Sequence, residues 1–147
     1  MPRSRKTSSA PIVTAARSAV LDASVLVRAI VEPQGKGAKW VADVDQGMVE
    51  GHTAVLAFTE VSNAFLGYVR AGGLRREDAV SALDALADLP LQLHGGELAP
   101  AALGTALELG LSAYDGTYAA LAESIDRLLV TADRRLAEAF ARSELLD

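Results

Sequence analysis

The sequence has no cysteine. This absence excludes a disulfide framework and a thiolate nucleophile, and it removes a common zinc ligand. The sequence also lacks any apolar run long enough to cross a bilayer. We therefore expect a cytoplasmic protein that does not associate with membranes.

Positive charge is scarce outside the N-terminus. The chain has a net charge of −5, yet residues 1–18 hold four basic side chains and no acidic one. Residues 19–147 hold 10 basic and 19 acidic side chains, a net charge of −9. Such an acidic body argues against a simple basic groove for nucleic acid. It is compatible with a protein that binds phosphates through metal ions held by its own carboxylates.

Length and hydrophobicity indicate one domain. The chain has 147 residues, of which 50% are hydrophobic, enough for a single globular core. Residues 1–18 are basic, contain Ser, Ala and Pro, and show no apolar periodicity. We expect a flexible tail or an added extension there. The domain then spans residues 19–147.

Short apolar segments alternate with helical patterns along this domain. We expect strands at residues 20–21, 48–49, 91–93 and 128–130. We expect helices at residues 24–31, 37–46, 53–71, 75–89, 100–109, 116–124 and 134–141. This alternation predicts an α/β sandwich with a parallel sheet.

Asp22 interrupts the first apolar run, Ala19–Val27. Burying an unpaired charge is costly, so such a carboxylate is usually hydrogen-bonded, protonated or close to a cation. The apolar run at 128–130 ends in a similar way, three residues before an acid, Asp133. In open α/β sheets, ligands bind beyond the carboxyl ends of the strands, near a topological switch point. If the two strands are parallel neighbours, Asp22 and Asp133 converge at one edge of the sheet.

Two further carboxylates can join them. Glu60 lies on a stripe of small residues along its predicted helix, and Asp115 lies just ahead of another helix. Four carboxylates gathered closely cannot all stay ionised, and a divalent cation removes that conflict. Oxygen ligands without cysteine or suitably spaced histidine favour Mg²⁺ or Mn²⁺ over zinc. Such cations, bridged to phosphate oxygens, are the usual apparatus of phosphodiester hydrolysis.

Each carboxylate also has a purely structural interpretation. Asp22 and Asp133 can cap the helices that follow them, and Ser112 with Asp115 fits a capping box. Glu60 can be a solvated helix residue. The joint order of strand-Asp, helix-Glu, Asp-helix and strand-Thr-x-Asp favours one common site, because four independent caps would not be expected at these positions.

Four segments carry a resemblance to a known family. They are LDASVLV (21–27), TEVSNAF (59–65), LSAYDGTYAALAE (111–123) and LLVTADRRLAEAF (128–140). In this order they resemble PIN-domain ribonucleases, specifically VapC-type toxins of bacterial toxin–antitoxin systems. The resemblance covers residues 19 to about 141, and YDGTYAALA and LLVTAD are its most specific parts.

The resemblance implies a PIN-like α/β/α sandwich with a short, mostly parallel sheet, and endoribonuclease activity that depends on Mg²⁺, for which Mn²⁺ can substitute. It implies catalytic and metal-binding roles for an acidic quartet: Asp22, Glu60, Asp115 and Asp133. Within this quartet, Asp22 and Asp115 are the expected direct ligands. It also implies supporting roles for three polar residues: Ser24, Asn63 and Thr131.

The resemblance also implies partners. A VapB-type antitoxin would cover the cleft with its C-terminal segment and add a positive group there, while its N-terminal domain binds DNA. The substrate would be RNA, either tRNA or rRNA. We expect a homodimer, and a heterotetramer or larger complex with the antitoxin.

Three basic residues are candidates for contacts with RNA phosphates: Arg28, Arg134 and Arg135. An RNA substrate must be held somewhere on an acidic body, although ordinary surface charge is the alternative interpretation.

Two further sets of residues receive weaker assignments. Leu26, Ile30 and the helix of Trp40 can form an apolar surface that receives the antitoxin. His52 and His94 are isolated in the sequence and lack metal-ligand spacing, so we expect them to be structural.

The sequence therefore predicts a metal-dependent endoribonuclease toxin that hydrolyses RNA phosphodiester bonds with a metal-activated water. Two alternatives stay open. One is a housekeeping RNA-processing nuclease with the same chemistry, and the other is a non-catalytic module that binds a partner protein.

Overall fold

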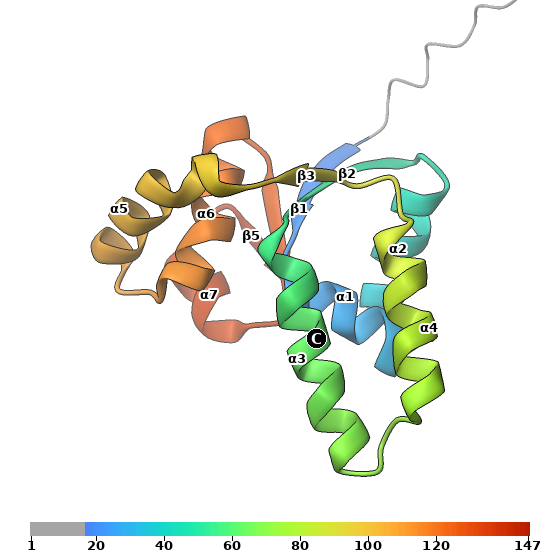
Figure 1. The fold of residues 1–147 in the computed structure, drawn as a ribbon. Coiled ribbons are helices and arrows are strands. Elements are labelled where there is room, and N and C mark those ends of the chain that lie inside the picture. The colour runs from blue at the N-terminus through green and yellow to red at the C-terminus, as the bar shows by residue number, and fades with distance from the viewer. Residues whose placement is uncertain (1–16) are drawn as a thin grey trace, which may run out of the picture.

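The computed structural model describes residues 17–147 (Figure 1). Its strands are β1 Arg17–Leu21, β2 Val49–Ala54, β3 Gln92–His94, β4 Leu128–Thr131 and β5 Ser143–Leu145. Its α-helices are α1 Ala23–Val31, α2 Lys36–Asp45, α3 Leu56–Arg70, α4 Arg76–Ala87, α5 Ala99–Leu109, α6 Ala113–Ile125 and α7 Arg134–Ala139. A short 3-10 helix, Gly96–Leu98, precedes α5.

The five strands form one parallel sheet in the order β3-β2-β1-β4-β5. The chain moves outward from β1 through β2 to β3 and then returns to place β4 against the other side of β1. Leu21 at the end of β1 pairs with Val130 near the end of β4. The direction of winding therefore changes between β1 and β4, where doubly wound sheets bind their ligands. The prediction that these strands are parallel neighbours is confirmed.

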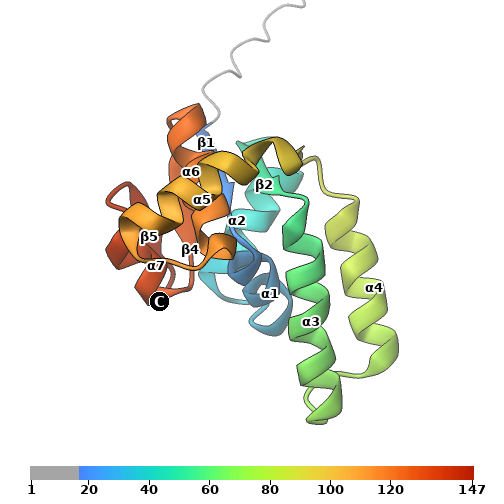
Figure 2. The ribbon, with the colours of Figure 1, turned by 60° about the vertical axis from the view of Figure 1, so that its left-hand side comes forward.

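Helices cover both faces of this sheet (Figures 1 and 2). Helix α6 packs on β1 and β2 with α5 beside it, whereas α1 and α2 lie against the opposite face. Helices α3 and α4 form a long hairpin that extends from the body beside α1. The central strands are enclosed on both faces, which explains their continuous apolar runs. In the part of the chain described, no helix has the length and apolar character needed to span a membrane.

The first strand begins earlier than predicted. Arg17 and Ser18 belong to β1, so the predicted boundary of the tail at residue 18 is wrong by these two residues. The Arg17 guanidinium lies over the Trp40 ring, 4.8 Å from its centre, and the Ser18 hydroxyl donates to Glu50 at 3.1 Å. These contacts come from elements distant in sequence, which a local pattern does not reveal. The rest of the predicted tail, residues 1–16, lies outside the described residues.

The boundary between β2 and α3 also differs from the prediction. Strand β2 continues to Ala54 and α3 begins at Leu56, so a helix starting at Thr53 or Ala54 is wrong. The buried Thr53 hydroxyl donates to the carbonyl oxygen of Leu21 at 2.7 Å, and this contact fixes Thr53 in the sheet. Strand β5 was not predicted, because it is short and only partly buried.

His52 and His94 are neighbours in space. Strands β2 and β3 pair, and His52 Nδ1 lies 3.0 Å from His94 Nε2. The other ring nitrogen of His52 lies 3.0 Å from Glu50 Oε1. The two histidines are far apart in the sequence and form a pair because β2 and β3 are adjacent strands.

Candidate active site

Asp22 is held at the carboxyl end of β1 by several hydrogen-bond donors. Its Oδ1 accepts from the Ser24 hydroxyl and from the backbone N–H groups of Ser24 and Val25, at 3.0 and 3.3 Å. Asp22 is therefore the N-cap of α1. Its Oδ2 accepts from the Thr131 hydroxyl at 2.6 Å. One carboxylate thus joins the start of α1 to the end of β4.

The two hydroxyl groups that contact Asp22 are themselves fixed by the backbone after β4. Ser24 Oγ accepts from the Ala132 N–H at 2.8 Å, and Thr131 Oγ1 accepts from the Asp133 N–H at 2.9 Å. Because a hydroxyl has one proton, accepting from the backbone leaves that proton free to point toward Asp22. Ser24 and Thr131 therefore lie where the resemblance implied, as supports of this carboxylate.

Burial dominates the electrostatics of Asp22, which is 4% exposed. Desolvation raises its pKa from 3.8 to about 6, even though hydrogen bonds from Ser24, Thr131 and Val25 lower it. The protein thus compensates the negative charge only in part. A cation beside Asp22 would favour its ionised form.

Glu60 is bound to Tyr118, a residue that the sequence analysis did not single out. The Tyr118 hydroxyl donates to Glu60 Oε1 at 2.5 Å, and the Tyr118 side chain is almost fully buried. Burial, this hydrogen bond and the negative charges of Glu60 and Asp22 hold the pKa of Tyr118 far above its usual range. The phenol therefore stays neutral and remains a donor. The helical spacing could have identified it, since Tyr118 lies one turn after Asp115.

Asp115 lies in the first turn of α6, and not ahead of the helix as predicted. The N-cap is Ser112, whose hydroxyl accepts from the Asp115 N–H at 3.1 Å. Asp133 caps α7, with Oδ1 accepting from the N–H groups of Arg135 and Leu136 at 2.9 and 3.3 Å. The capping interpretations are thus correct for Asp22, Asp133 and Ser112. A cap at the end of a strand also presents its carboxylate to the ligand edge of the sheet, so the two interpretations do not exclude each other.

The position of Asp115 depends on close packing between α5 and α6. A Cβ added to Gly116 would come within 2.6 Å of the Ala102 carbonyl oxygen and 3.0 Å of the Ala106 Cβ. Only glycine allows this approach without a backbone shift. Gly116 therefore fixes the first turn of α6 and, with it, the adjacent Asp115.

Three of the four carboxylates are linked electrostatically, Asp133 to Asp115 and Asp115 to Glu60. Burial raises the pKa of Asp115, and the charge of Asp133 raises it further, whereas Ser112 and Arg135 lower it. Burial also raises the pKa of Glu60, where the Tyr118 hydrogen bond lowers it and the charge of Asp115 raises it. Asp22 and Glu60 both act on Tyr118. The topology thus gathers the predicted quartet around the carboxyl ends of β1 and β4.

The donor set suits a hard divalent cation. Within residues 17–147, no three His, Cys, Asp or Glu side chains are grouped closely enough to form a ready metal cage. Mg²⁺ does not need one, because it usually binds through one or two carboxylates together with water and substrate phosphates. The residues gathered here offer oxygen ligands and mutual repulsion that a cation relieves. By this chemistry, the site fits Mg²⁺ or Mn²⁺.

A cavity of about 390 Å³ opens beside Ser24 and Glu60, between α1, α3 and the loop after β4. Arg28 lines it, whereas Arg134 is exposed on α7. Arg135 lies close enough to Asp115 to lower its pKa, and its guanidinium donates to the carbonyl oxygen of Gly110 at 2.9 Å. Of the three predicted basic residues, Arg28 and Arg135 lie beside residues of the acidic site.

The structure does not connect Asn63 to the quartet. Its side chain is exposed on α3, and it makes no hydrogen bond to any residue of the described range. Its supporting role remains a prediction from the resemblance.

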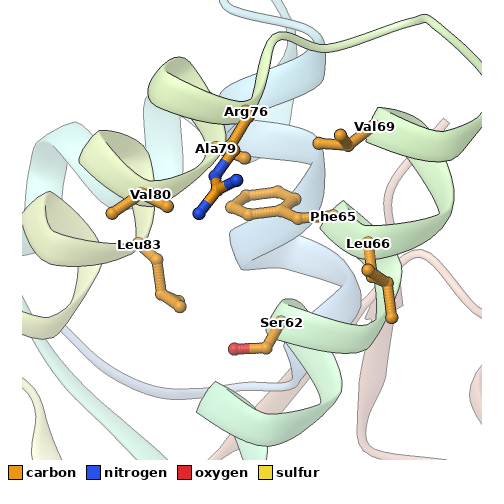
Figure 3. A pocket seen from close by; sticks show the side chains of 8 residues that line it. All are labelled: Ser62, Phe65, Leu66, Val69, Arg76, Ala79, Val80 and Leu83. Atoms are coloured by element: carbon orange, nitrogen blue, oxygen red, sulfur yellow. The ribbon is translucent and has the colours of Figure 1, made fainter.

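The predicted apolar surface for a partner is only partly exposed. Leu26 is fully buried and Trp40 is 7% exposed, so neither can form a docking surface. Ile30 is partly exposed and lines a cavity of about 450 Å³ between α1, α2 and α4. A more apolar groove, of about 410 Å³, lies between α3 and α4, as Figure 3 shows. Local apolar spacing cannot distinguish a core-facing stripe from an exposed one.

Comparison with known proteins decides the family. A model of the PIN domain matches residues 19–141. The chain belongs to the PIN-domain family. A curated relative of this PIN domain, Ribonuclease VapC3 from Pyrobaculum aerophilum, is 37% identical over 124 residues, which cover 82% of this chain and 93% of the relative. The PIN domain described here is thus a homologue of the VapC ribonucleases.

Solved structures agree with this PIN fold. PAE2754 from Pyrobaculum aerophilum has a TM-score of 0.70 and 26% identity, over 88% of this chain and 90% of that one. VapBC2 from Rickettsia felis, bound to a DNA fragment from its promoter, has a TM-score of 0.65 and 14% identity, over 88% of this chain and 99% of that one. A toxin–antitoxin complex from Klebsiella pneumoniae has a TM-score of 0.59 and 12% identity, over 86% of this chain and 95% of that one. The last two show similarity of fold.

Proposed function

We propose that this PIN domain is a Mg²⁺-dependent endoribonuclease that acts as the toxin of a type II toxin–antitoxin pair. The observation that carries the proposal is the setting of Asp22. It lies at the switch point of the sheet, buried and oriented by Ser24 and Thr131. Two other carboxyl groups of the quartet, Glu60 and Asp115, have raised pKa values. Relatives named as a VapC ribonuclease and as toxin–antitoxin complexes support it.

The residues of the site divide the work of RNA hydrolysis. Asp22, directly after β1, and Asp115, on α6, would hold the cation, with Glu60 and Asp133 completing its surroundings. When bound, Mg²⁺ would lower the pKa of a water and stabilise charge on the phosphate oxygens. Glu60, whose pKa is raised by burial, can accept a proton from the attacking water. Cleavage would leave a 5′-phosphate and a 3′-hydroxyl, and tRNA or rRNA is the proposed substrate.

Metal addition and removal test the proposal directly. Purified protein should cleave structured RNA with Mg²⁺ or Mn²⁺, and EDTA should abolish cleavage. Mn²⁺ should also raise the melting temperature in the absence of RNA. At a hundredfold excess over its Kd, it should add about 3 kcal/mol to the free energy of unfolding. A protein that cleaves no RNA and shows no such rise is the non-catalytic module of the alternative interpretation.

Expression in cells separates a toxin from a housekeeping nuclease. A toxin should arrest growth, and coexpression of the product of a small neighbouring gene should restore it. Mapping RNA ends after induction would identify the substrate in the same experiment. Unimpaired growth with active nuclease would favour the housekeeping function.

The antitoxin segment is proposed to bind the groove between α3 and α4. Phe65 forms its floor, and Leu66 and Val80 leave 44% and 59% of their surfaces exposed at its rim. An apolar patch of this kind typically marks a protein interface. The similar Klebsiella pneumoniae and Rickettsia felis structures are toxin–antitoxin assemblies, which favours an antitoxin as the occupant.

Val80→Lys is expected to weaken antitoxin binding at least about tenfold, because it places an unpaired charge against an apolar partner. Isothermal titration with the purified antitoxin would measure the change. Leu107→Lys, on α5 and 77% exposed, is the matched control and should bind normally. Equal affinities for both variants would place the antitoxin elsewhere. RNA cleavage should be unaffected in either variant.

A further inference from the structure

The cavity beside Glu60 leads from the acidic site along α3. Glu60, Ala64 and Tyr68 line it at intervals of four residues, so they lie on one face of the helix. With a rise of about 1.5 Å per residue, Tyr68 is roughly 12 Å from Glu60 along the helix axis. The small Ala64 leaves the space between them open. A short segment of an extended chain bound at Glu60 would therefore reach Tyr68.

The far end of this cavity carries an aromatic ring. Tyr68 is 40% exposed, and its aromatic edge lies near Gly73, just past the end of α3. Phe65, on the same helix, is instead buried in the core. An exposed aromatic face is a platform on which an unpaired nucleobase can stack.

A guanidinium group faces the same cavity from α1. Arg28 is, for the described part of the chain, the one basic residue that lines it. Its Nε lies 3.3 Å from Glu32 Oε2, in a pair whose side chains are one third and one half exposed. Exposed pairs of this kind contribute little, so a phosphate can displace Glu32. A planar guanidinium is well suited to bind a phosphate through two parallel hydrogen bonds.

We propose that Tyr68 and Arg28 form a subsite for one nucleotide of single-stranded RNA next to the scissile phosphate, with the base stacked on Tyr68 and its phosphate held by Arg28. This inference rests on the proposed ribonuclease function. With a cation bound, the acidic site at the near end of the cavity would hold the scissile phosphate, and Arg28 on α1 would attract the next phosphate. The placement of charges along the cavity therefore suits a phosphate that lies one nucleotide away from the scissile bond. The apolar groove between α3 and α4 is a separate surface, so the two partners need not compete for Tyr68.

Steady-state cleavage of a short single-stranded RNA with Mn²⁺ tests the subsite. Tyr68→Ala should raise KM about tenfold, because base stacking is lost, and leave kcat within about twofold. Tyr68→Phe keeps the ring and should behave like the wild type. Leu103→Ala, on α5 and 57% exposed, is the control and should also be unchanged. The Mn²⁺-induced rise in melting temperature should be equal in all four proteins.

Binding without cleavage gives an independent measurement. In an Asp115→Asn background, fluorescence anisotropy should show a Kd for single-stranded RNA about tenfold higher with Tyr68→Ala, and no effect of this variant on a fully paired duplex. Arg28→Gln should reduce the salt slope of log Kd by about 0.7, the value for one phosphate contact on a single strand. Arg75→Gln, at an exposed position on the surface, should not.

The outcomes distinguish the subsite from the function on which it rests. If the wild-type protein cleaves RNA but Tyr68→Ala changes neither KM nor Kd, the subsite is wrong and the ribonuclease function stands. An equal loss in Tyr68→Phe would show that the hydroxyl, and not stacking, is responsible, which overturns the proposal. The proposal would also be overturned by a Tyr68→Ala variant that loses antitoxin binding but keeps RNA binding. A wild-type protein that neither binds nor cleaves RNA contradicts both.

Discussion

Asp22→Asn is expected to reduce RNA cleavage by about 10³-fold, the scale on which removal of one essential charged group acts. The asparagine can still accept the backbone hydrogen bonds that cap α1, so the fold should persist. What it loses is the negative charge at the switch point between β1 and β4. Cleavage assays over a range of Mn²⁺ concentrations would show whether the loss is one of metal binding, since added metal would then restore part of the rate.

Asp84→Asn is the control for this experiment. Asp84 is exposed on α4, away from the carboxyl ends of the strands, and its replacement should leave cleavage unchanged. Thr131→Val removes one donor to Asp22 while keeping the shape of the side chain, and we expect an intermediate loss. Full activity of Asp22→Asn in EDTA-treated buffer would refute the metal-dependent mechanism.

In the metal-free protein, Asp22→Asn should raise stability at neutral pH. The folded-state pKa of Asp22 is about 6 and its ordinary value is 3.8. An acid whose pKa rises on folding stabilises the native state below its ordinary pKa, and this contribution is lost as the pH rises through the folded value. Two pKa units correspond to about 3 kcal/mol. At pH 7.5 in EDTA, the free energy of unfolding of the variant should exceed that of the wild type by up to about this amount.

The pH dependence separates this effect from a general change in packing. Chemical denaturation of both proteins between pH 4 and 7.5 should show a difference that is largest at pH 7.5, falls through pH 6 and vanishes near pH 4. Saturating Mn²⁺ should stabilise the wild type alone, so the difference in stability between the two proteins should disappear or change sign. A variant that is less stable than the wild type at pH 7.5, or a gap that grows on acidification, would contradict the assignment of burial as the cause.

The same carboxylate shows how much the sequence predicts about the site. Asp22 stood out because it ends an apolar run, and Asp133 because it follows another in the same way. The two strands proved to be parallel neighbours, so both acids lie at the ligand edge of the sheet. The local patterns also predicted N-caps, and the structure shows that the two capping residues lie at this edge of the sheet.

Contacts between distant segments were beyond the sequence analysis. Tyr118 reaches Glu60 across 58 positions of the chain, and no local pattern marks that hydrogen bond. Leu26 and Ile30 share an apolar pattern, yet one is buried and the other borders an open cavity. His52 and His94 become a pair only because β2 and β3 are adjacent.

The sequence by itself determined the alternation of strands and helices, the family through its four segments, and the identity of the acidic residues. Periodicity, caps and strand ends are local properties, because they are determined by residues that are close together in the sequence. The tertiary structure alone decided that β4 returns to the side of β1 and that the first turn of α6 is pressed on α5 at Gly116. It also decided which apolar side chains stay exposed. These features depend on packing between segments far apart in the chain. The contacts that stabilise them form only when the whole domain folds.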